Sequence, residues 1–156
     1  MEEVFIRQGE YRDFPILASI ISTSKAWTCY GINYDTAIGL FEKMEDTIYV
    51  VEINCRQVVG FITLSIGGVG NIGSYVRMVA VDEPYRGQGI GAKLIDYIAN
   101  LAFQKIPNIF LICSVANVRA QRFYEKTGFV KVGILSDLVV SGHDEIFYRK
   151  TAGILR

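Results

Sequence analysis

The feature that most constrains this chain is the stretch 76–96, in which an apolar run is followed by a turn, three glycines and an amphipathic pattern. Val79, Ala80 and Val81 fit a buried strand, and Pro84 prevents either neighbouring element from running through the turn. The stretch therefore predicts a strand, a tight turn and a helix in immediate succession.

The predicted helix begins within three glycines that let the backbone turn sharply and expose its N–H groups: Gly87, Gly89 and Gly91. A core-facing stripe recurs at intervals of four residues along the helix, which we expect at about 89–104: Ile90, Leu94, Ile98 and Ala102. Free N–H donors and a partial positive charge at a helix start suit a phosphate or pyrophosphate. Arg86, just before the glycines, could add a charge-assisted contact.

Two other phosphate-binding patterns do not fit the glycines. A nucleoside triphosphate loop requires Gly-x-x-x-x-Gly-Lys-Ser/Thr, but Gly87 is followed at the last three of these positions by Ala92, Lys93 and Leu94. A Gly-x-Gly-x-x-Gly sequence occurs at 68–73, but it precedes a strand and opens no helix. We interpret residues 68–73 as a hairpin loop.

The pattern that remains, Arg86-x-x-Gly89-x-Gly91 after a strand, resembles the acetyl-CoA pyrophosphate loop (Gln/Arg-x-x-Gly-x-Gly/Ala) of the GNAT superfamily of N-acetyltransferases. Residues 117–129, Asn-Val-Arg-Ala-Gln-Arg-Phe-Tyr-Glu-Lys-Thr-Gly-Phe, resemble the second CoA-side signature of that family, Asn-x-x-Ala-x-x-Phe/Leu-Tyr-x-x-x-Gly-Phe. The order and the spacing of the two motifs also match. The resemblance covers residues 45–150 well and the N-terminal third only in its pattern of elements.

The second motif also makes sense without the family. Asn117 is a good N-cap, and Ala120, Phe123 and Tyr124 mark one face of a short helix that Gly128 is placed to end. This segment therefore predicts a capped helix followed by a strand.

Length and composition narrow the class of protein. A chain of 156 residues with 51% hydrophobic residues predicts a single domain over 1–156. Lysine plus arginine equals aspartate plus glutamate at 16 each, so no global charge favours nucleic acid or an anionic membrane. Three separated cysteines and one histidine indicate neither a disulfide framework nor a metal site. With no signal peptide or membrane-length apolar run, we expect a cytoplasmic protein.

The periodicity of the chain predicts a mixed α/β fold. We expect strands at 4–7, 47–53, 58–66, 76–81, 109–115, 129–135 and 144–149, and helices at 11–24, 35–44, 89–104 and just after Asn117. The helix between the strands 76–81 and 109–115 makes a crossover, and hence a parallel pair. The resemblance implies a GNAT-like central sheet, largely antiparallel with a splayed parallel pair, and about four flanking helices.

The resemblance implies acetyl-CoA as cosubstrate, with its pantetheine paired to backbone groups of the strand before the glycine loop. The implied cofactor-binding residues are Val79, Ala80, Val81, Arg86, Gly87, Gln88, Gly89, Ile90, Gly91, Asn117 and Tyr124. An acceptor amine would attack the thioester directly, with backbone N–H groups stabilising the oxyanion. Tyr124 occupies the position of the family's tyrosine acid, although a core tyrosine would also fit there.

The general base is the point at which the sequence departs from the family. The strand positions where relatives carry a carboxylate hold Tyr75, Arg77 and Met78, and on the next strand Ile112 and Cys113. A water held by Tyr75 or Ser114 could act instead, or the amine could arrive neutral. Glu42, Asp137 and His143 are further candidates, each more easily explained as surface residues. Cys113 lies in a buried run and does not suit a nucleophile.

The loop between the first two helices holds Trp27 and Tyr30, and such loops often bind ligands. In the family this loop lines the acceptor side, so Trp27 and Tyr30 are candidate substrate-binding residues. Tyr75 and Arg77, on the strand before the glycine loop, are two further candidates. The alternative is that Trp27 and Tyr30 only cap the edge of the core.

The sequence thus predicts an N-acetyltransferase that transfers the acetyl group of acetyl-CoA to a primary amine of a peptide, a protein or a small molecule. Two alternatives stay open: a non-catalytic CoA-binding sensor or interaction module, and an acyltransferase for a larger acyl group. We expect no metal, no nucleic acid partner and no membrane partner. The resemblance also allows a homodimer.

Overall fold

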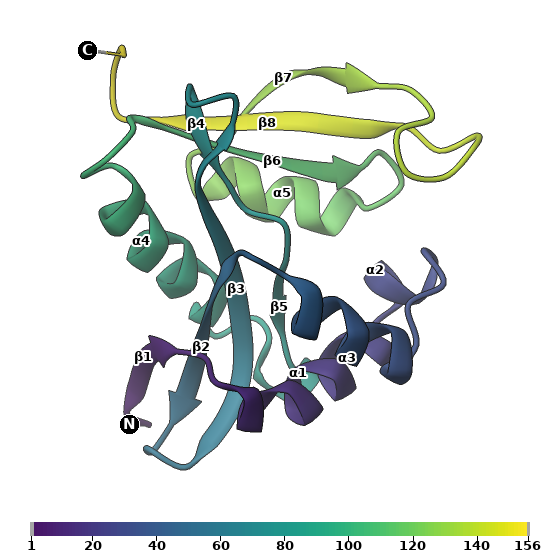
Figure 1. Cartoon of the computed structure of the whole chain (residues 1–156), viewed down its shortest axis with the longest axis vertical. Coiled ribbons are helices and arrows are strands. Elements are labelled where there is room, and N and C mark those ends of the chain that lie inside the picture. The colour runs from purple at the N-terminus through teal and green to yellow at the C-terminus, as the bar shows by residue number, and fades with distance from the viewer. Residues whose placement is uncertain (1, 156) are drawn as a thin grey trace. The chain divides into compact units, whose positions relative to one another are not determined.

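The structure is a computed structural model that describes residues 2–155 (Figure 1). Its internal contacts divide the chain into two units. The first unit comprises the residues up to Leu64 together with Met78–Tyr97, and the second comprises Ser65–Arg77 together with the residues from Ile98 onward. A single domain over 1–156 stays a prediction.

The first unit is built on an antiparallel sheet with the strand order β1-β2-β3-β5. Its strands are β1 (Val4–Gln8), β2 (Thr47–Ile53), the N-terminal part of β3 (Gln57–Val69) and β5 (Val79–Val81). Its helices are η1 (Tyr11–Asp13), α1 (Phe14–Ser22), α2 (Lys25–Thr28), α3 (Tyr34–Lys43), η2 (Glu83–Tyr85) and the start of α4 (Ile90–Ala102).

Helices α1 and α3 lie side by side and supply the core of the first unit (Figure 1). Leu17 and Ile21 of α1 are fully buried, and Phe41 of α3 packs edge-on against Phe61 of β3, with ring centroids 5.4 Å apart. The sequence places these helices through local signals. Pro15 lies in the first turn of α1, and the side chain of Asn33 caps α3 by accepting from Thr36 N at 2.9 Å.

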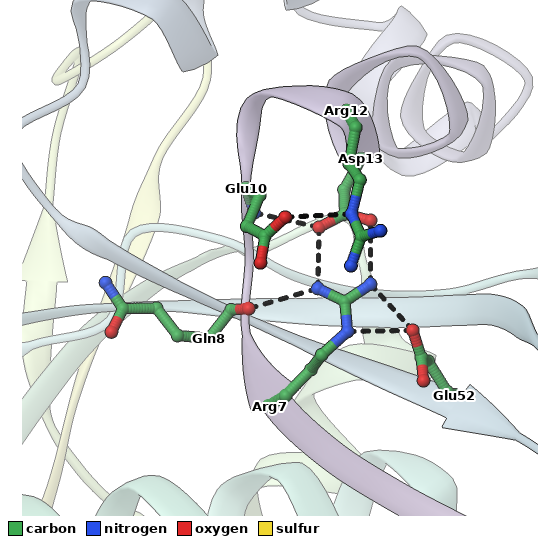
Figure 2. A network of polar contacts seen from close by, with 6 residues as sticks. All are labelled: Arg7, Gln8, Glu10, Arg12, Asp13 and Glu52. Carbon is green, nitrogen blue, oxygen red and sulfur yellow. Dashed lines mark hydrogen bonds and ion pairs between the residues drawn. The ribbon is translucent and has the colours of Figure 1, made fainter. Parts of the chain in front are cut away.

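A charged network joins β1, β2 and the entry to α1 (Figure 2). The Arg7 guanidinium donates to both carboxylate oxygens of Asp13 at 2.8 and 2.9 Å, and its Nε donates to Glu52 at 2.8 Å. Asp13 also accepts from the backbone N–H of Glu10 at 2.8 Å. Asp13 is buried, so the network fixes the chain where it leaves the sheet and enters the helix.

The second unit contains the sheet order β3-β4-β6-β8-β7, beginning with the C-terminal part of β3. The strands are β4 (Gly73–Tyr75), β6 (Asn108–Ser114), β7 (Val130–Leu135) and β8 (Glu145–Thr151), and the helix α5 (Val118–Lys126) follows β6. Only the β4–β6 pairing is parallel among the described strands. Figure 1 shows β6, β8 and β7 running side by side.

The predicted mixed α/β fold class, mostly antiparallel with one parallel pair, is confirmed, and five α-helices are described where about four were expected. The fifth is the single turn α2, in a segment expected to be a loop. The hairpin expected at 68–73 is also confirmed, since Val69 pairs with Gly73 across the turn.

The single strand predicted at 76–81 is wrong. The chain forms β4, leaves strand geometry at Val76–Met78 and then forms β5. The backbone partners explain the break: Val76 N donates to Phe110 O of β6 at 3.0 Å, whereas Met78 N donates to the Thr63 hydroxyl of β3 at 3.0 Å. Consequently β4, and not β5, makes the parallel pair with β6.

None of the helices within residues 2–155 has the length and apolar character needed to cross a bilayer.

Candidate active site

Strand β5 in the first unit pairs with β3 along one edge, and its other edge faces away from β3. Ala80 lies opposite Phe61 of β3. Two positions before and after it, Met78 O accepts from Thr63 N and Asp82 N donates to Val59 O, both on β3. Because antiparallel ladders alternate, the backbone groups of Val79 and Val81 point away from β3. These are the two residues whose backbone groups were predicted to pair with the cosubstrate.

The turn after β5 is held by its own side chains. Asp82 caps η2 by accepting from Glu83 N at 2.9 Å, and Gln88 Nε2 donates to Pro84 O at 3.3 Å. Arg86 is half-buried, and its Nε donates to Val81 O at 2.8 Å. Arg86 therefore fastens the loop to β5, a contact that the sequence did not predict, while its terminal amino groups remain available for an anion.

The glycines before α4 have the geometry of an anion-binding turn. Gly87 and Gly89 are exposed and have φ values of 76° and 81°, and a Cβ built on either would meet no atom within 4 Å. Gly91 lies inside the first turn of α4 and is not among the glycines with positive φ. The helix begins at the buried Ile90, so its first N–H groups follow directly on a loop whose glycines, Gly87 and Gly89, have open space around them.

Helix α5 in the second unit carries the other predicted residues. The side chain of Asn117 accepts from Ala120 N at 3.1 Å, which confirms the predicted N-cap. The helix ends where Gly128 takes a φ of 94° and Phe129 N donates to Tyr124 O at 3.0 Å. Thus Asn117 and Tyr124 are held two turns apart by local capping at both ends.

The Tyr124 ring is half-buried among aromatic neighbours. Its centroid lies 5.8 Å from that of Phe129 and 6.0 Å from that of Tyr148. Burial raises the pKa of Tyr124 well above its usual value, and the nearby Cys113, Tyr75 and Tyr148 raise it further. The phenol therefore keeps its proton throughout the physiological pH range.

Two other titratable groups lie close to Tyr124. Burial raises the pKa of the Cys113 thiol to about 12, and the charge of Glu145 adds to this effect. Burial, with the nearby charge of Glu125, also raises the pKa of Tyr148 to about 12, and the Tyr148 hydroxyl donates to Glu125 at 3.4 Å. The expectation that Cys113 is buried is confirmed, and its raised pKa makes it a poor nucleophile.

The predicted acceptor-side residues are divided between the units. Tyr75 and Arg77 belong to the second unit, where the Arg77 guanidinium lies 5.4 Å from the centre of the Tyr75 ring in a cation–π contact. Trp27, on α2 in the first unit, is half-buried and packs against the core cluster, which fits the core-edge alternative. Tyr30, also half-buried, follows α2. Substrate binding by these four residues stays a prediction.

Residues 11–129 match the sequence profile of the Acetyltransferase (GNAT) family, which is more than half of the chain. The chain belongs to the GNAT family. An uncharacterized N-acetyltransferase of Methanocaldococcus jannaschii is 33% identical over 116 residues, which cover 72% of this chain and 71% of that protein. N-alpha-acetyltransferase 30 of Schizosaccharomyces pombe is 36% identical over 78 residues, which cover 47% of this chain and 50% of that protein.

The fold agrees with this assignment. A Bacillus anthracis acetyltransferase solved in complex with acetyl coenzyme A superposes with a TM-score of 0.72 at 23% identity, covering 97% of this chain and 99% of that one. Family membership thus identifies this GNAT protein as an acetyl-CoA-dependent N-acyltransferase. Within residues 2–155, no cluster of three or more histidine, cysteine, aspartate or glutamate side chains is arranged to hold a metal ion.

The carboxylates that the sequence offered as alternative bases have surface or structural positions in this GNAT protein. Glu42 is exposed on α3, and Asp137 accepts from Gly142 N at 2.6 Å in the loop before β8. His143, exposed in the same loop, lines a cleft. Glu145, which the sequence analysis did not single out, is buried, with only 1% of the residue exposed. A glutamate opening the apolar run Glu-Ile-Phe-Tyr was the signal that could have found it.

Proposed function

We propose that this GNAT protein transfers the acetyl group of acetyl-CoA directly to a primary amine of a peptide, a protein or a small molecule, without a covalent enzyme intermediate. The observation that carries the mechanism is the environment of Tyr124, a phenol that packs against Phe129 and Tyr148 at the helix position where the family motif places an acid. Burial raises its pKa. The raised pKa of Cys113 agrees with direct transfer, because a thiol that keeps its proton is a poor nucleophile.

Acetyl-CoA supplies an activated acetyl thioester, and the residues of this chain fit its parts. The open loop at Gly87 and Gly89 suits the pyrophosphate, with Arg86 close by. The outward backbone groups of Val79 and the N–H of Val81 suit the pantetheine amides, whereas Val81 O already accepts from Arg86. Ala80, Gln88, Ile90, Gly91 and Asn117 complete the proposed binding set. These assignments are supported by the local geometry of each segment.

Tyr124 is proposed to donate a hydrogen bond to the leaving sulfur. A phenol hydroxyl can donate a hydrogen bond to the sulfur, and that bond strengthens as negative charge develops there. A water held by Tyr75 or Ser114 can carry a proton away from the acceptor amine.

Among primary amines we favour the α-amino group of a peptide or protein. One curated relative is an N-alpha-acetyltransferase. The pKa of the amine also favours an α-amino group. An α-amine has a pKa about 2.5 units below that of a lysine side chain, so the free energy needed to deprotonate it at neutral pH is about 3.4 kcal/mol lower. An acceptor that is easier to deprotonate suits this chain, because the positions at which relatives carry a carboxylate base hold none here: Tyr75, Arg77, Met78, Ile112 and Cys113.

The test is release of free CoA thiol from acetyl-CoA with three acceptors: a library of short peptides with free N-termini, the same peptides with blocked N-termini, and spermidine. We expect activity with the free peptides, and a loss of about 100-fold in kcat for Tyr124→Phe with unchanged acetyl-CoA binding. Turnover of spermidine alone would overturn the α-amine assignment. Binding of acetyl-CoA without turnover of any amine would overturn catalysis in favour of a binding module, and competition by longer acyl-CoAs would reveal a larger acyl group.

We also propose a reducing compartment, the cytoplasm, for this protein. All three cysteines are free, and Cys29 and Cys55 are exposed to solvent.

A further inference from the structure

Strand β7 forms an outer edge of the sheet in the second unit, on the far side of β8 (Figure 1). Among the strands that the structure describes, β7 pairs only with β8. Its other edge therefore presents backbone N–H and C=O groups that another strand can pair with. Proteins usually protect such an edge with charged side chains, with proline or with a covering element.

Strand β7 carries little of this protection. Lys131 is the one charged residue among Val130–Leu135. The β7–β8 register shifts between Lys131 and Gly133, and beyond the shift Gly133, Ile134 and Leu135 pair regularly. The large apolar residues of β7 and of the loop after it are 37–69% exposed: Val130, Val132, Ile134, Leu135, Leu138 and Val139. A continuous apolar edge of this kind marks an interaction surface.

The ladder between β6 and β8 determines which backbone groups of β7 face outward. Val115 N donates to Asp144 O at 3.0 Å, in register with the β6–β8 pairing. Because antiparallel hydrogen bonds alternate, the backbone groups of Ile146 also face β6 and not β7. Ile134 lies opposite Ile146. The N–H and C=O of Ile134 consequently point away from β8, toward the open edge.

The sequence around Ile134 is complementary to itself when it is reversed. Lys131 comes three positions before Ile134, and Asp137 comes three positions after it. If two β7 strands paired antiparallel about Ile134, Lys131 of each copy would face Asp137 of the other, and Gly133 would face Leu135. A two-fold interface has this property, since residue i meets residue j and residue j meets residue i.

The charges favour this register and this occupant. Opposite charges across a pair of strands are stabilising, and like charges are destabilising, so a register centred on Lys131 would be disfavoured. Asp137 is exposed just beyond the end of β7, where its Oδ1 accepts from Gly142 N at 2.6 Å. The carboxylate is thus held in place before a partner arrives. A second copy supplies both charges at the required positions.

We propose that β7 is an interface between two copies of this chain, in which the two strands pair antiparallel about a two-fold axis at Ile134. The two Ile134 residues exchange both of their backbone hydrogen bonds, the exposed apolar side chains cover one another, and a Lys131–Asp137 ion pair forms at each end. This inference is independent of the proposed function, because no residue of β7 belongs to the proposed binding set. One strand and a short loop form a smaller interface than the standard of about 800 Å² per partner, so we expect a Kd of about 10 μM.

The experiment is analytical ultracentrifugation of the full chain between about 1 and 100 μM, a range that spans the expected Kd. The wild type should change from monomer to dimer over this range. Ile134→Lys places two like charges together at the two-fold axis and should stay monomeric throughout. The matched control is Phe5→Lys on β1, because Phe5 and Ile134 are both 51% exposed and both lie on edge strands. Phe5→Lys should dimerise as the wild type does.

A second pair of variants tests the register. Lys131→Glu replaces both attractive ion pairs with repulsive ones and should weaken dimerisation about tenfold. Lys105→Glu makes the same change of charge at an exposed position outside β7, and should leave the Kd unchanged. Thermal melting checks that each variant is folded. If Ile134→Lys does not fold, Lys131→Glu is read in its place.

A wild type that stays monomeric at about 100 μM would overturn the proposal and leave this edge to a strand from another protein. A dimer that survives Ile134→Lys, or one that Phe5→Lys disrupts equally, would also overturn it. Equal weakening by Lys131→Glu and Lys105→Glu would overturn the register centred on Ile134. Acetyl-CoA binding by the wild type is measured separately, so a failure of the proposed function is distinguished from a failure of this inference.

Discussion

Replacement of Arg7 by alanine removes a cation that three elements of the first unit share. The Arg7 guanidinium bridges Asp13 at the entry to α1 and Glu52 on β2, and it donates to the carbonyl of Gln8 at 3.1 Å (Figure 2). The side chains of Arg7, Asp13 and Glu52 are 19%, 6% and 15% exposed. The variant would leave the carboxylates of Asp13 and Glu52 in a poorly hydrated position without the cation that both contact.

The burial of the two ion pairs of Arg7 determines how much stability the variant should lose. Removing one partner of a buried ion pair costs about 3–5 kcal/mol, because the remaining charge stays desolvated. For a chain of this size, 1 kcal/mol corresponds to about 2–4 °C in Tm, so Arg7→Ala should lower the Tm by roughly 10 °C. The matched control is Arg12→Ala: Arg12 pairs with Glu10 at 2.8 Å, but both side chains are largely exposed. That pair contributes about 0–1 kcal/mol.

The assay is thermal and urea unfolding of the wild type and the two variants as a function of pH. Burial alone would raise the pKa of Asp13, but hydrogen bonds from Arg7 and from Glu10 N, with the charges of Arg7 and Arg12, outweigh it and hold the pKa below the usual value. A lowered folded-state pKa stabilises the fold above the unfolded-state pKa, near 4, and the benefit is lost as the pH falls through the folded-state value.

The difference between the wild type and Arg7→Ala should therefore be largest near neutral pH and should shrink in acid below about pH 4. If Arg7→Ala and Arg12→Ala destabilise the protein equally, or if the difference is independent of pH, the account of the network is refuted.

Two further results are expected from the second unit. Asn117→Ala should lower the free energy of unfolding by about 1 kcal/mol, because the α5 cap is lost. Asn117→Ser can still cap the helix and should lose much less stability. Equal losses in the two variants would contradict the capping assignment. In native protein at pH 8, a thiol reagent should modify only Cys29 and Cys55, because Cys113 is buried and its pKa is raised to about 12. All three cysteines should react after denaturation. Fast labelling of Cys113 in the native protein would contradict its burial.

The segments that the sequence predicted well are those whose signals are local. The stripe Ile90, Leu94, Ile98 and Ala102 is buried as expected, because a helix repeats its environment every three to four residues. The cap at Asn117 was predictable in the same way, since the capping contact spans only three residues.

The features that the sequence could not predict depend on contacts between distant residues. The break between β4 and β5 follows from which strand supplies the hydrogen-bond partner, and no local pattern at Val76–Met78 encodes that choice. Arg7 and Glu52 are 45 positions apart, so their pairing is visible only once β1 and β2 are in register.

The candidate site likewise combines features predicted from local motifs with features that depend on distant residues. The glycine loop and Tyr124 were predicted by motif, and the structure supplied their backbone geometry and their surroundings. Glu145 was missed because its burial arises from strands on both sides, β6 and β7, that are set by the register of the whole sheet.

The most direct test of the central claim is isothermal titration of the purified protein with acetyl-CoA, free CoA and ATP, repeated with Gly89→Arg and with Gly70→Ala. Both glycines have positive φ and open space around the Cβ position, but Gly70 lies in the β3–β4 turn, away from the loop 86–91 in sequence. We predict micromolar binding of both CoA forms and none of ATP, with CoA binding abolished by Gly89→Arg and preserved in Gly70→Ala. A folded wild-type protein that binds no CoA, or CoA binding that survives Gly89→Arg, would contradict the account.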